Sequence, residues 1–405
     1  MIHFNHTTLP NGLEIIAETD PDAHSAAIGF FVKTGARDEA PEAMGVSHFL
    51  EHMMFKGTDT RSAEDVDRDF DAIGADHNAY TTSELTAFWA HVLPEHLPRA
   101  EAILHDILRP ALRQQDFDKE KAVILEEIAM YEDNPFWVLY ERTMETYYAD
   151  HPLSHRVLGT RETVEGLERG QMSDYFTRRY SADNTVVALA GRLDFDAMAA
   201  RIGDHCGPWN TTRPQRHHES RKAIDDAFTM RSSTVSRHYT LMVAPAPALA
   251  DERRHAASIL AQILGDVEGS RLYWALIETG VAEDAQASYE GRDGVGDYLI
   301  HFTCSPEAAE ECERIVLEQI DQLVGSLTED DLQRVRSKIA TGVTLQGERP
   351  AGRMQRLGQM WTYLGEYRSL EAELARINAV TLDDLREVWS AYPLRPRVTG
   401  RLAPV

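Results

Sequence analysis

One segment of the sequence reads Val46-Ser47-His48-Phe49-Leu50-Glu51-His52-Met53-Met54-Phe55-Lys56-Gly57. In a helix, residues three or four positions apart lie on the same face, so His48, Glu51 and His52 would present two imidazoles and a carboxylate together. Two neutral imidazoles on adjacent turns can hold a zinc ion, and a carboxylate that is not itself a ligand can deprotonate a water molecule on the metal. The segment therefore predicts a zinc site with Glu51 as its general base.

The pattern His-x-x-Glu-His is the signature of the inverzincin class of metallopeptidases. The alternative interpretation is a solvated surface helix, because a short motif of this kind can also arise by chance. Apolar neighbours such as Phe49, Leu50 and Met53 indicate instead a mostly buried helix, in which a carboxylate needs a partner. The neighbours thus favour the metal interpretation.

A third ligand is expected, because zinc hydrolases commonly use three protein ligands and leave the fourth position to water. Two histidines and one glutamate are one of the known ligand sets. Residues 119–132 have apolar residues at helical spacing, which predicts a helix. Glu120 and Glu127 lie seven positions apart on it, two turns, and so share one face.

This combination resembles the pitrilysin or insulinase family of zinc peptidases, and within it the mitochondrial processing peptidase β-subunit and its bacterial relatives. Glu127 lies 75 positions after His52 and seven after Glu120, which is similar to the Glu-x6-Glu motif that follows the metal helix in that family. The resemblance implies one Zn²⁺ per chain, held by His48, His52 and Glu127, with Glu51 as the catalytic base. It also implies that Glu120 orients a ligand without binding the metal.

Residues 76–81 also resemble the family, in which they form a sheet edge near the metal. The resemblance implies that a peptide substrate adds there as an extra strand and that Asn78, Ala79 and Tyr80 bind it. For Tyr80, a core aromatic is an equally good interpretation. Glu84 belongs to the same family stretch, where it would support the metal site, and a capping role is as good an interpretation. The resemblance covers most of residues 1–200, including 49–58, 78–84 and 159–162.

Two segments of the chain resemble each other. Each has a helical pattern, then a tyrosine, then an apolar run with a glycine: Tyr180 and Gly191 in the first, Tyr392 and Gly400 in the second. The tyrosines are 212 positions apart and the glycines 209, so an internal repeat of about half the chain predicts two similar domains. The fold class is α+β, each domain being a mostly antiparallel sheet packed with helices. The expected organisation is a zinc-binding catalytic domain (1–210), a polar linker (211–226) and a homologous non-catalytic domain facing the site (227–405).

Hydrophobic periodicity and turn residues predict the elements of the first half. The expected strands are 13–18, 25–33, 76–81, 86–92 and 185–190, and the expected helices are 63–73, 96–108, 116–131, 136–148 and 172–180.

The second half has no His-x-x-Glu-His. In many family members this half carries an Arg and a Tyr that hold the substrate carbonyl opposite the metal. Here Ile277 or Glu278 stands in place of the Arg and Glu283 in place of the Tyr. The resemblance therefore implies a dimer, formed either with a second copy or with a homologous subunit that carries the Arg and Tyr pair. The alternative is a non-catalytic structural subunit, although such subunits have usually lost the zinc ligands that this chain keeps.

Composition limits the remaining functions. The chain has 405 residues, 43% of them hydrophobic, and its formal charge of −25 argues against nucleic acid or an anionic membrane as a partner. No run approaches a membrane span, and the N-terminus shows no signal region. Cys206, Cys304 and Cys312 lack metal or redox spacing, so we expect reduced thiols and a cytoplasmic location. The acidic charge could favour basic peptides, but a solvated acidic surface explains it equally well.

Overall fold

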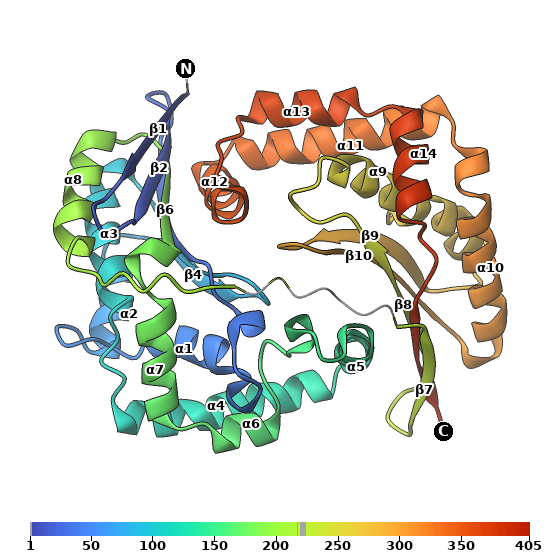
Figure 1. Cartoon of the computed structure of the whole chain (residues 1–405), viewed down its shortest axis with the longest axis horizontal. Coiled ribbons are helices and arrows are strands. Elements are labelled where there is room, and N and C mark those ends of the chain that lie inside the picture. The colour runs from blue at the N-terminus through green and yellow to red at the C-terminus, as the bar shows by residue number, and fades with distance from the viewer. Residues whose placement is uncertain (1, 217, 219–223) are drawn as a thin grey trace. The chain divides into compact units, whose positions relative to one another are not determined.

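The computed structural model describes residues 2–216, 218 and 224–405. They form two compact units (Figure 1). The first unit comprises Met1–Ala129, His155–His217 and Thr344–Arg368, and the second comprises Met130–Ser154, His218–Val343 and Ser369–Val405. The predicted linker, 211–226, lies partly outside the described residues.

The first unit is built on a six-stranded sheet with the order β1-β2-β6-β3-β5-β4. β2 and β6 are parallel, and every other neighbouring pair is antiparallel. β3 and β6 are buried along their whole length, as their apolar sequences predict, whereas β4 lies at the edge. The strands are β1 (His3–Thr8), β2 (Glu14–Thr19), β3 (Ala26–Val32), β4 (Asp76–Thr81), β5 (Thr86–Val92) and β6 (Thr185–Gly191).

The second unit contains a five-stranded sheet with the order β7-β11-β8-β10-β9. Its one parallel pair, β7 and β11, corresponds to β2 and β6, and the strands after it are antiparallel as in the first sheet. Tyr180 and Tyr392 each cap the helix that precedes the matching strand, β6 or β11. The predicted repeat and fold class are therefore confirmed. The strands are β7 (Asp226–Ser232), β8 (His238–Ala246), β9 (Asp284–Gly291), β10 (Gly296–Cys304) and β11 (Val398–Pro404).

Helices cover these sheets. The predicted helices of the first half are all present, with ends that differ from the predictions by a few residues. In the first unit they are α1 (Val46–Met54), α2 (Ala63–Asp71), α3 (Leu97–Ile107), most of α4 (Gln114–Glu132), α6 (Arg161–Gly166), α7 (Arg169–Arg179), α8 (Phe195–Cys206) and α12 (Pro350–Leu364). In the second unit they are α5 (Pro135–Tyr148), α9 (Arg254–Gly265), α10 (Ala309–Gln322), most of α11 (Glu329–Gly347), α13 (Leu370–Ala379) and α14 (Leu382–Ala391).

The first sheet is apolar on both faces, so it needs helices on both. Phe30 of β3 points into the main core, which α1, α3 and α8 cover, and Phe31 points into a second core on the opposite face. Met354 and Leu357 of α12 complete that second core. A helix from the second half of the sequence therefore belongs to the first unit.

In the same way, the second sheet is covered by α5, a helix from the first half of the sequence. Leu139 and Tyr147 of α5 pack with Leu241 of β8 and Val398 of β11 in one apolar cluster. The compact units thus differ from the expected uninterrupted halves, because each sheet buries one face against a helix from the other half of the sequence.

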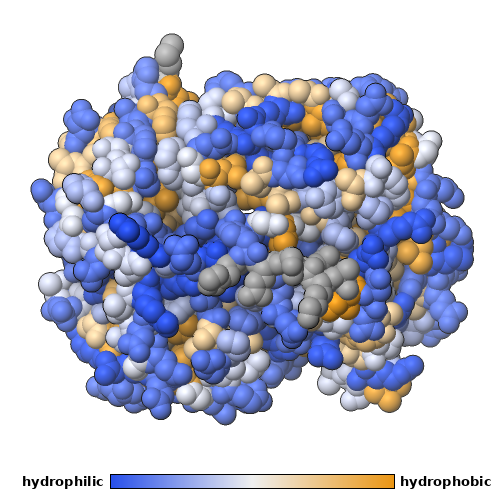
Figure 2. All heavy atoms as spheres, viewed as in Figure 1, coloured by the Kyte–Doolittle hydropathy of each residue, from blue (hydrophilic) through white to orange (hydrophobic). Residues whose placement is uncertain are grey.

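On the face drawn in Figure 2, hydrophilic residues predominate and apolar residues form scattered patches. Among the described helices, none combines the length and the apolarity that crossing a membrane requires.

Candidate metal centre

The helix α1 starts at a backbone position that suits glycine. Gly45 has φ +95°, and a Cβ there would lie 2.5 Å from the carbonyl oxygen of Leu158. The two side-chain oxygens of Glu39 accept hydrogen bonds from the backbone N–H groups of Gly45 and Ser47, each 2.7 Å long. Glu39 thus satisfies N–H groups that a helix start leaves without partners. With the apolar side of α1 buried in the main core, this contact fixes where the helix begins.

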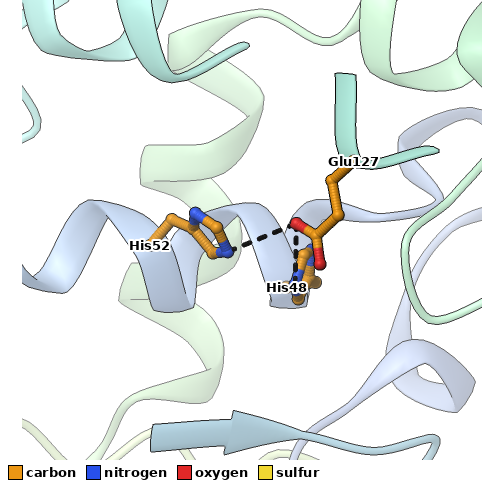
Figure 3. A group of neighbouring side chains, drawn as sticks. All are labelled: His48, His52 and Glu127. Carbon is orange, nitrogen blue, oxygen red and sulfur yellow. Dashed lines mark ion pairs between the residues drawn. The ribbon is translucent and has the colours of Figure 1, made fainter. Parts of the chain in front are cut away.

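Three expected ligands converge beside α1. His48 and His52 lie on α1, and Glu127 reaches them from α4 (Figure 3). The Oε2 atom of Glu127 lies 3.7 Å from Nε2 of His48 and 3.7 Å from Nε2 of His52. All three ligand atoms lie within 4.8 Å of one another. Tetrahedral ligands with bonds of roughly 2.0–2.1 Å are separated by about 3.3 Å, so the two distances to Glu127 would need only a small contraction on zinc binding.

Glu120, which also lies on α4, contacts the ring of His52. Nδ1–H of His52 donates a 2.8 Å hydrogen bond to Oε1 of Glu120, and Nε2 of the same ring faces Oε2 of Glu127. Nζ of Lys56 lies 2.8 Å from the other oxygen of Glu120. Burial raises the pKa of Glu120, but the contacts with His52 and Lys56 outweigh burial and lower it overall. Glu120 therefore lies where the sequence predicts a supporting carboxylate, and its role stays a prediction.

The electrostatics of the two histidines suit a cation. Burial, followed by the charge of His52, lowers the pKa of His48 to about 3, so that imidazole is neutral, the form that binds metals. Burial also lowers the pKa of His52, but Glu120, Glu127 and Glu51 outweigh it and raise the pKa overall. The raised pKa reports an excess of carboxylates around this pair, which a divalent cation would offset.

The expected base, Glu51, lies half-buried on α1 between the two histidines. The hydroxyl of Thr81, at the end of β4, donates a 2.6 Å hydrogen bond to Oε2 of Glu51. Burial raises the pKa of Glu51, and the Thr81 hydrogen bond and His52 only partly counter it. The result is a carboxyl group whose pKa lies above its usual range and whose Oε2 is hydrogen-bonded to Thr81. Sequence reasoning did not identify Thr81, although it is the last residue of the predicted strand.

β4 is an edge strand, and among the described strands it pairs only with β5. Asn78 is exposed, whereas Ala79 and Tyr80 are half-buried. The ring of Tyr80 packs against the core beneath α12, and its hydroxyl donates to Gln355 at 3.0 Å and accepts from Gln359 at 2.9 Å. Tyr80 therefore has core packing and polar contacts at once, and the binding of substrate by these three residues stays a prediction.

Glu84 lies in the turn after β4 and forms a buried ion pair with Arg37, 2.6 Å long. Its backbone carbonyl accepts a hydrogen bond from Arg216, which also pairs with Asp38. These contacts tie the turn after β4 to the loop before α1. Glu84 thus connects two segments that flank α1, and a direct role of Glu84 at the metal stays a prediction.

The residues that stand in place of the family Arg and Tyr belong to the second unit. Ile277 ends a one-turn π-helix, and Glu278 accepts a hydrogen bond from the hydroxyl of Tyr273. Glu283 is exposed and pairs with Arg237.

The structure thus combines a repeated sheet-and-helix architecture with His-x-x-Glu-His on one helix and a distant glutamate on another. The family model described as insulinase (peptidase family M16) matches residues 14–161, and that described as the peptidase M16 inactive domain matches residues 166–339. A Mycobacterium tuberculosis protein, named as an uncharacterized zinc protease, is 32% identical over 390 residues, which are 94% of this chain and 89% of that protein. The chain therefore belongs to peptidase family M16, the insulinase or pitrilysin family, as the motif resemblance predicts.

Solved structures show the same fold. A protease from Helicobacter pylori aligns with a TM-score of 0.93 at 18% identity, covering 100% of both chains. A chain in the structure of complex III2 from Candida albicans aligns with a TM-score of 0.85 at 17% identity, covering 98% of this chain and 95% of that one. The fold is thus shared by a protease and by a chain of complex III2.

Proposed function

We propose that this chain is the zinc-binding subunit of an endopeptidase that cleaves peptides or unfolded polypeptides. The observation that carries the proposal is the convergence of His48, His52 and Glu127 beside Glu51, whose carboxylate is held by Thr81. The names of the curated relatives, which call them zinc proteases, support zinc as the metal.

One zinc ion per chain would be held by Nε2 of His48, Nε2 of His52 and Oε2 of Glu127. When bound, zinc supplies Lewis acidity, which polarises a carbonyl group and makes water more acidic. Glu51 takes a proton from the attacking water and delivers it to the nitrogen of the leaving amine. Glu120 keeps His52 in the tautomer that presents Nε2.

The edge of β4 is where we place the peptide. An extended substrate would add there as a further strand along Asn78, Ala79 and Tyr80. Main-chain pairing of this kind has little dependence on side chains, so it suits unfolded polypeptides. Because Thr81 ends the strand and touches Glu51, the bound peptide would lead to the base.

The partner we propose is a second subunit in a dimer. Without the Arg and Tyr pair, this chain lacks donors for the substrate carbonyl, a loss of about 10²–10³ in rate if they act like other oxyanion donors. A homologous subunit that carries the pair would restore them. We place the protein in the cytoplasm, since Cys206, Cys304 and Cys312 are free and buried, as reduced structural thiols are.

Metal analysis beside a peptide-cleavage assay tests the centre. His52→Ala and Glu127→Ala should lose zinc, whereas Glu51→Gln should keep zinc and lose hydrolysis. Glu126→Gln is the matched control, because this exposed neighbour on α4 should leave both properties unchanged. Full activity in Glu51→Gln would refute the assignment of the base.

Titration of a candidate homologous subunit tests the partner. The chain alone should form a weakly active dimer, and activity should rise on addition of a subunit that carries the Arg and Tyr pair. High activity of the chain alone, unchanged by the addition, would contradict complementation.

A second candidate is a non-catalytic subunit. It is favoured by the match of the second half to the inactive-domain family model and by the fold of the complex III2 chain. A chain that binds zinc yet shows no cleavage, alone or with a homologous subunit, would establish this alternative.

A further inference from the structure

A second group of potential metal ligands lies on the helices that cover the first sheet. Glu101 and His105 are one turn apart on α3, and His205 lies on α8, which packs against α3. In the described part of the chain, this group and the His48 group each bring three ligand atoms within 4.8 Å of one another. Nothing in the proposed peptidase function uses the second group.

The contacts of this group resemble a coordination sphere. Nδ1 of His205 lies 2.9 Å from Oε1 and 3.0 Å from Oε2 of Glu101. Nδ1 of His105 lies 3.5 Å from Oε1 of Glu101 and 3.3 Å from its backbone carbonyl oxygen. These separations bracket the roughly 3.3 Å expected between tetrahedral nitrogen and oxygen ligands. Both imidazoles are part-exposed, so water can reach the remaining position.

The carboxylate is already oriented. Glu101 is 0% exposed, and a buried carboxylate needs positive partners. Nε of Arg201 donates a 2.8 Å hydrogen bond to Oε2 of Glu101, which leaves Oε1 in contact with both imidazoles.

We propose that Glu101, His105 and His205 form a second divalent-metal site of the zinc type, which clips α3 to α8. Two imidazoles and a carboxylate suit Zn²⁺ and neighbouring transition metals. The adjacent Cys206 is fully buried in the main core, so the donor atoms stay nitrogen and oxygen. The metal would stabilise the folded chain by mass action and take no part in hydrolysis.

The site should be weaker than the His48 site. The two imidazole rings lie face to face, with centroids 4.0 Å apart and planes 17° apart. Since the lone pairs lie in the ring planes, the rings must tilt before both nitrogens point to one ion, and Arg201 competes for the carboxylate.

The test uses the full chain with the first site removed by His52→Ala. This variant is dialysed against zinc and analysed for metal, and it is separately titrated with Co²⁺ while visible absorption is recorded. We expect one metal ion per chain, lost in His52→Ala/His205→Gln and in His52→Ala/His105→Gln. His52→Ala/His3→Gln is the matched control, because His3 is an exposed residue of β1, and it should keep the metal.

Thermal unfolding gives a second measurement. Zinc should raise the unfolding temperature of His52→Ala and leave that of the His205→Gln double variant unchanged, with circular dichroism showing that both are folded. Equal metal contents in the single and double variants, or no metal in His52→Ala, would overturn the proposal and reduce the group to an ion-pair cluster. Because no step measures cleavage, the result is independent of the proposed peptidase function.

Discussion

The hydroxyl of Thr81 donates a 2.6 Å hydrogen bond to Oε2 of Glu51. Thr81 ends the edge strand β4, and Glu51 lies one residue before a metal-binding histidine of the proposed site. One contact thus joins the strand on which we place the peptide to the carboxylate that we assign as its base. In the proposed mechanism, the strand that binds the peptide would also position the carboxylate that transfers the proton.

Replacing Thr81 by valine removes this hydrogen bond and keeps the side-chain shape. We expect kcat to fall roughly 10–100-fold, as for the loss of a hydrogen bond to a charged group, with zinc content and KM little changed. Thr81→Ser keeps the hydroxyl and should restore most of the rate. Steady-state cleavage of a fluorogenic peptide measures both, and equal rates in the valine and serine variants would contradict a role for the hydroxyl.

Glu120→Gln should weaken zinc binding by about 10–100-fold, because the carboxylate that holds Nδ1–H of His52 becomes a weaker acceptor. Competition with a chromophoric chelator measures the affinity. Lys56→Met is the control: it removes the other partner of Glu120 but keeps the contact with His52, so its effect should be smaller. An affinity unchanged in Glu120→Gln would show that His52 needs no such support.

The raised pKa of Glu39 predicts that the stability of the metal-free chain depends on pH. Burial raises its pKa to about 8 from the usual 4.5, against the hydrogen bonds from Ser47 and Gly45. A raised folded-state pKa gives a contribution that is complete below pH 4.5 and is lost as pH rises through about 8. Glu39→Gln lacks this titration, so the unfolding temperature of the unsubstituted chain should fall relative to the variant over that range.

Thermal unfolding at a series of pH values checks the Glu39 prediction. Glu42→Gln, at an exposed neighbouring position, should give a curve parallel to that of the unsubstituted chain. A parallel curve for Glu39→Gln as well would show that Glu39 does not titrate differently in the folded state.

Gly358 on α12 should respond to alanine in the opposite direction from an ordinary helical glycine. Alanine usually stabilises a helix by about 0.5–1 kcal/mol relative to glycine, and Gly342 on α11, where a Cβ would meet nothing within 4 Å, should follow that rule. At Gly358 a Cβ would lie 2.1 Å from the buried ring of Phe31. Gly358→Ala should therefore lower the free energy of unfolding by about 1–3 kcal/mol. Denaturant titration compares the variants, and stabilisation by both would contradict the tight packing of α12.

Much of the fold could be predicted because it is encoded locally. The helical spacing of His48, Glu51 and His52 predicted that they share one face of a helix. The repeat around Tyr180 and Tyr392 predicted two related sheets. β1 was missed, since its polar residues lack the apolar alternation that reveals a strand. Glu127 could be identified by the resemblance to the family, whose motif spacing it fits.

The unpredicted contacts are those between residues distant in the sequence. Thr81 is 30 positions from Glu51, and His205 is 104 from Glu101, so no local pattern joins them. Glu39 caps α1 from beyond a short 3-10 turn, outside the spacing of a capping box. Such contacts depend on how elements pack, which periodicity does not report.

Helix α5 comes from the first half of the sequence and packs in the second unit, and α12 comes from the second half and packs in the first. We therefore expect that neither half of the sequence can fold alone. A fragment ending at Arg216 would lack α12 and leave the core around Phe31 in water, and the remaining fragment would lack α5 and leave Val398 uncovered. Each fragment should aggregate when expressed alone, whereas the two produced together should yield soluble protein. The two fragments would then complement each other, because each contains the helix that the sheet of the other needs.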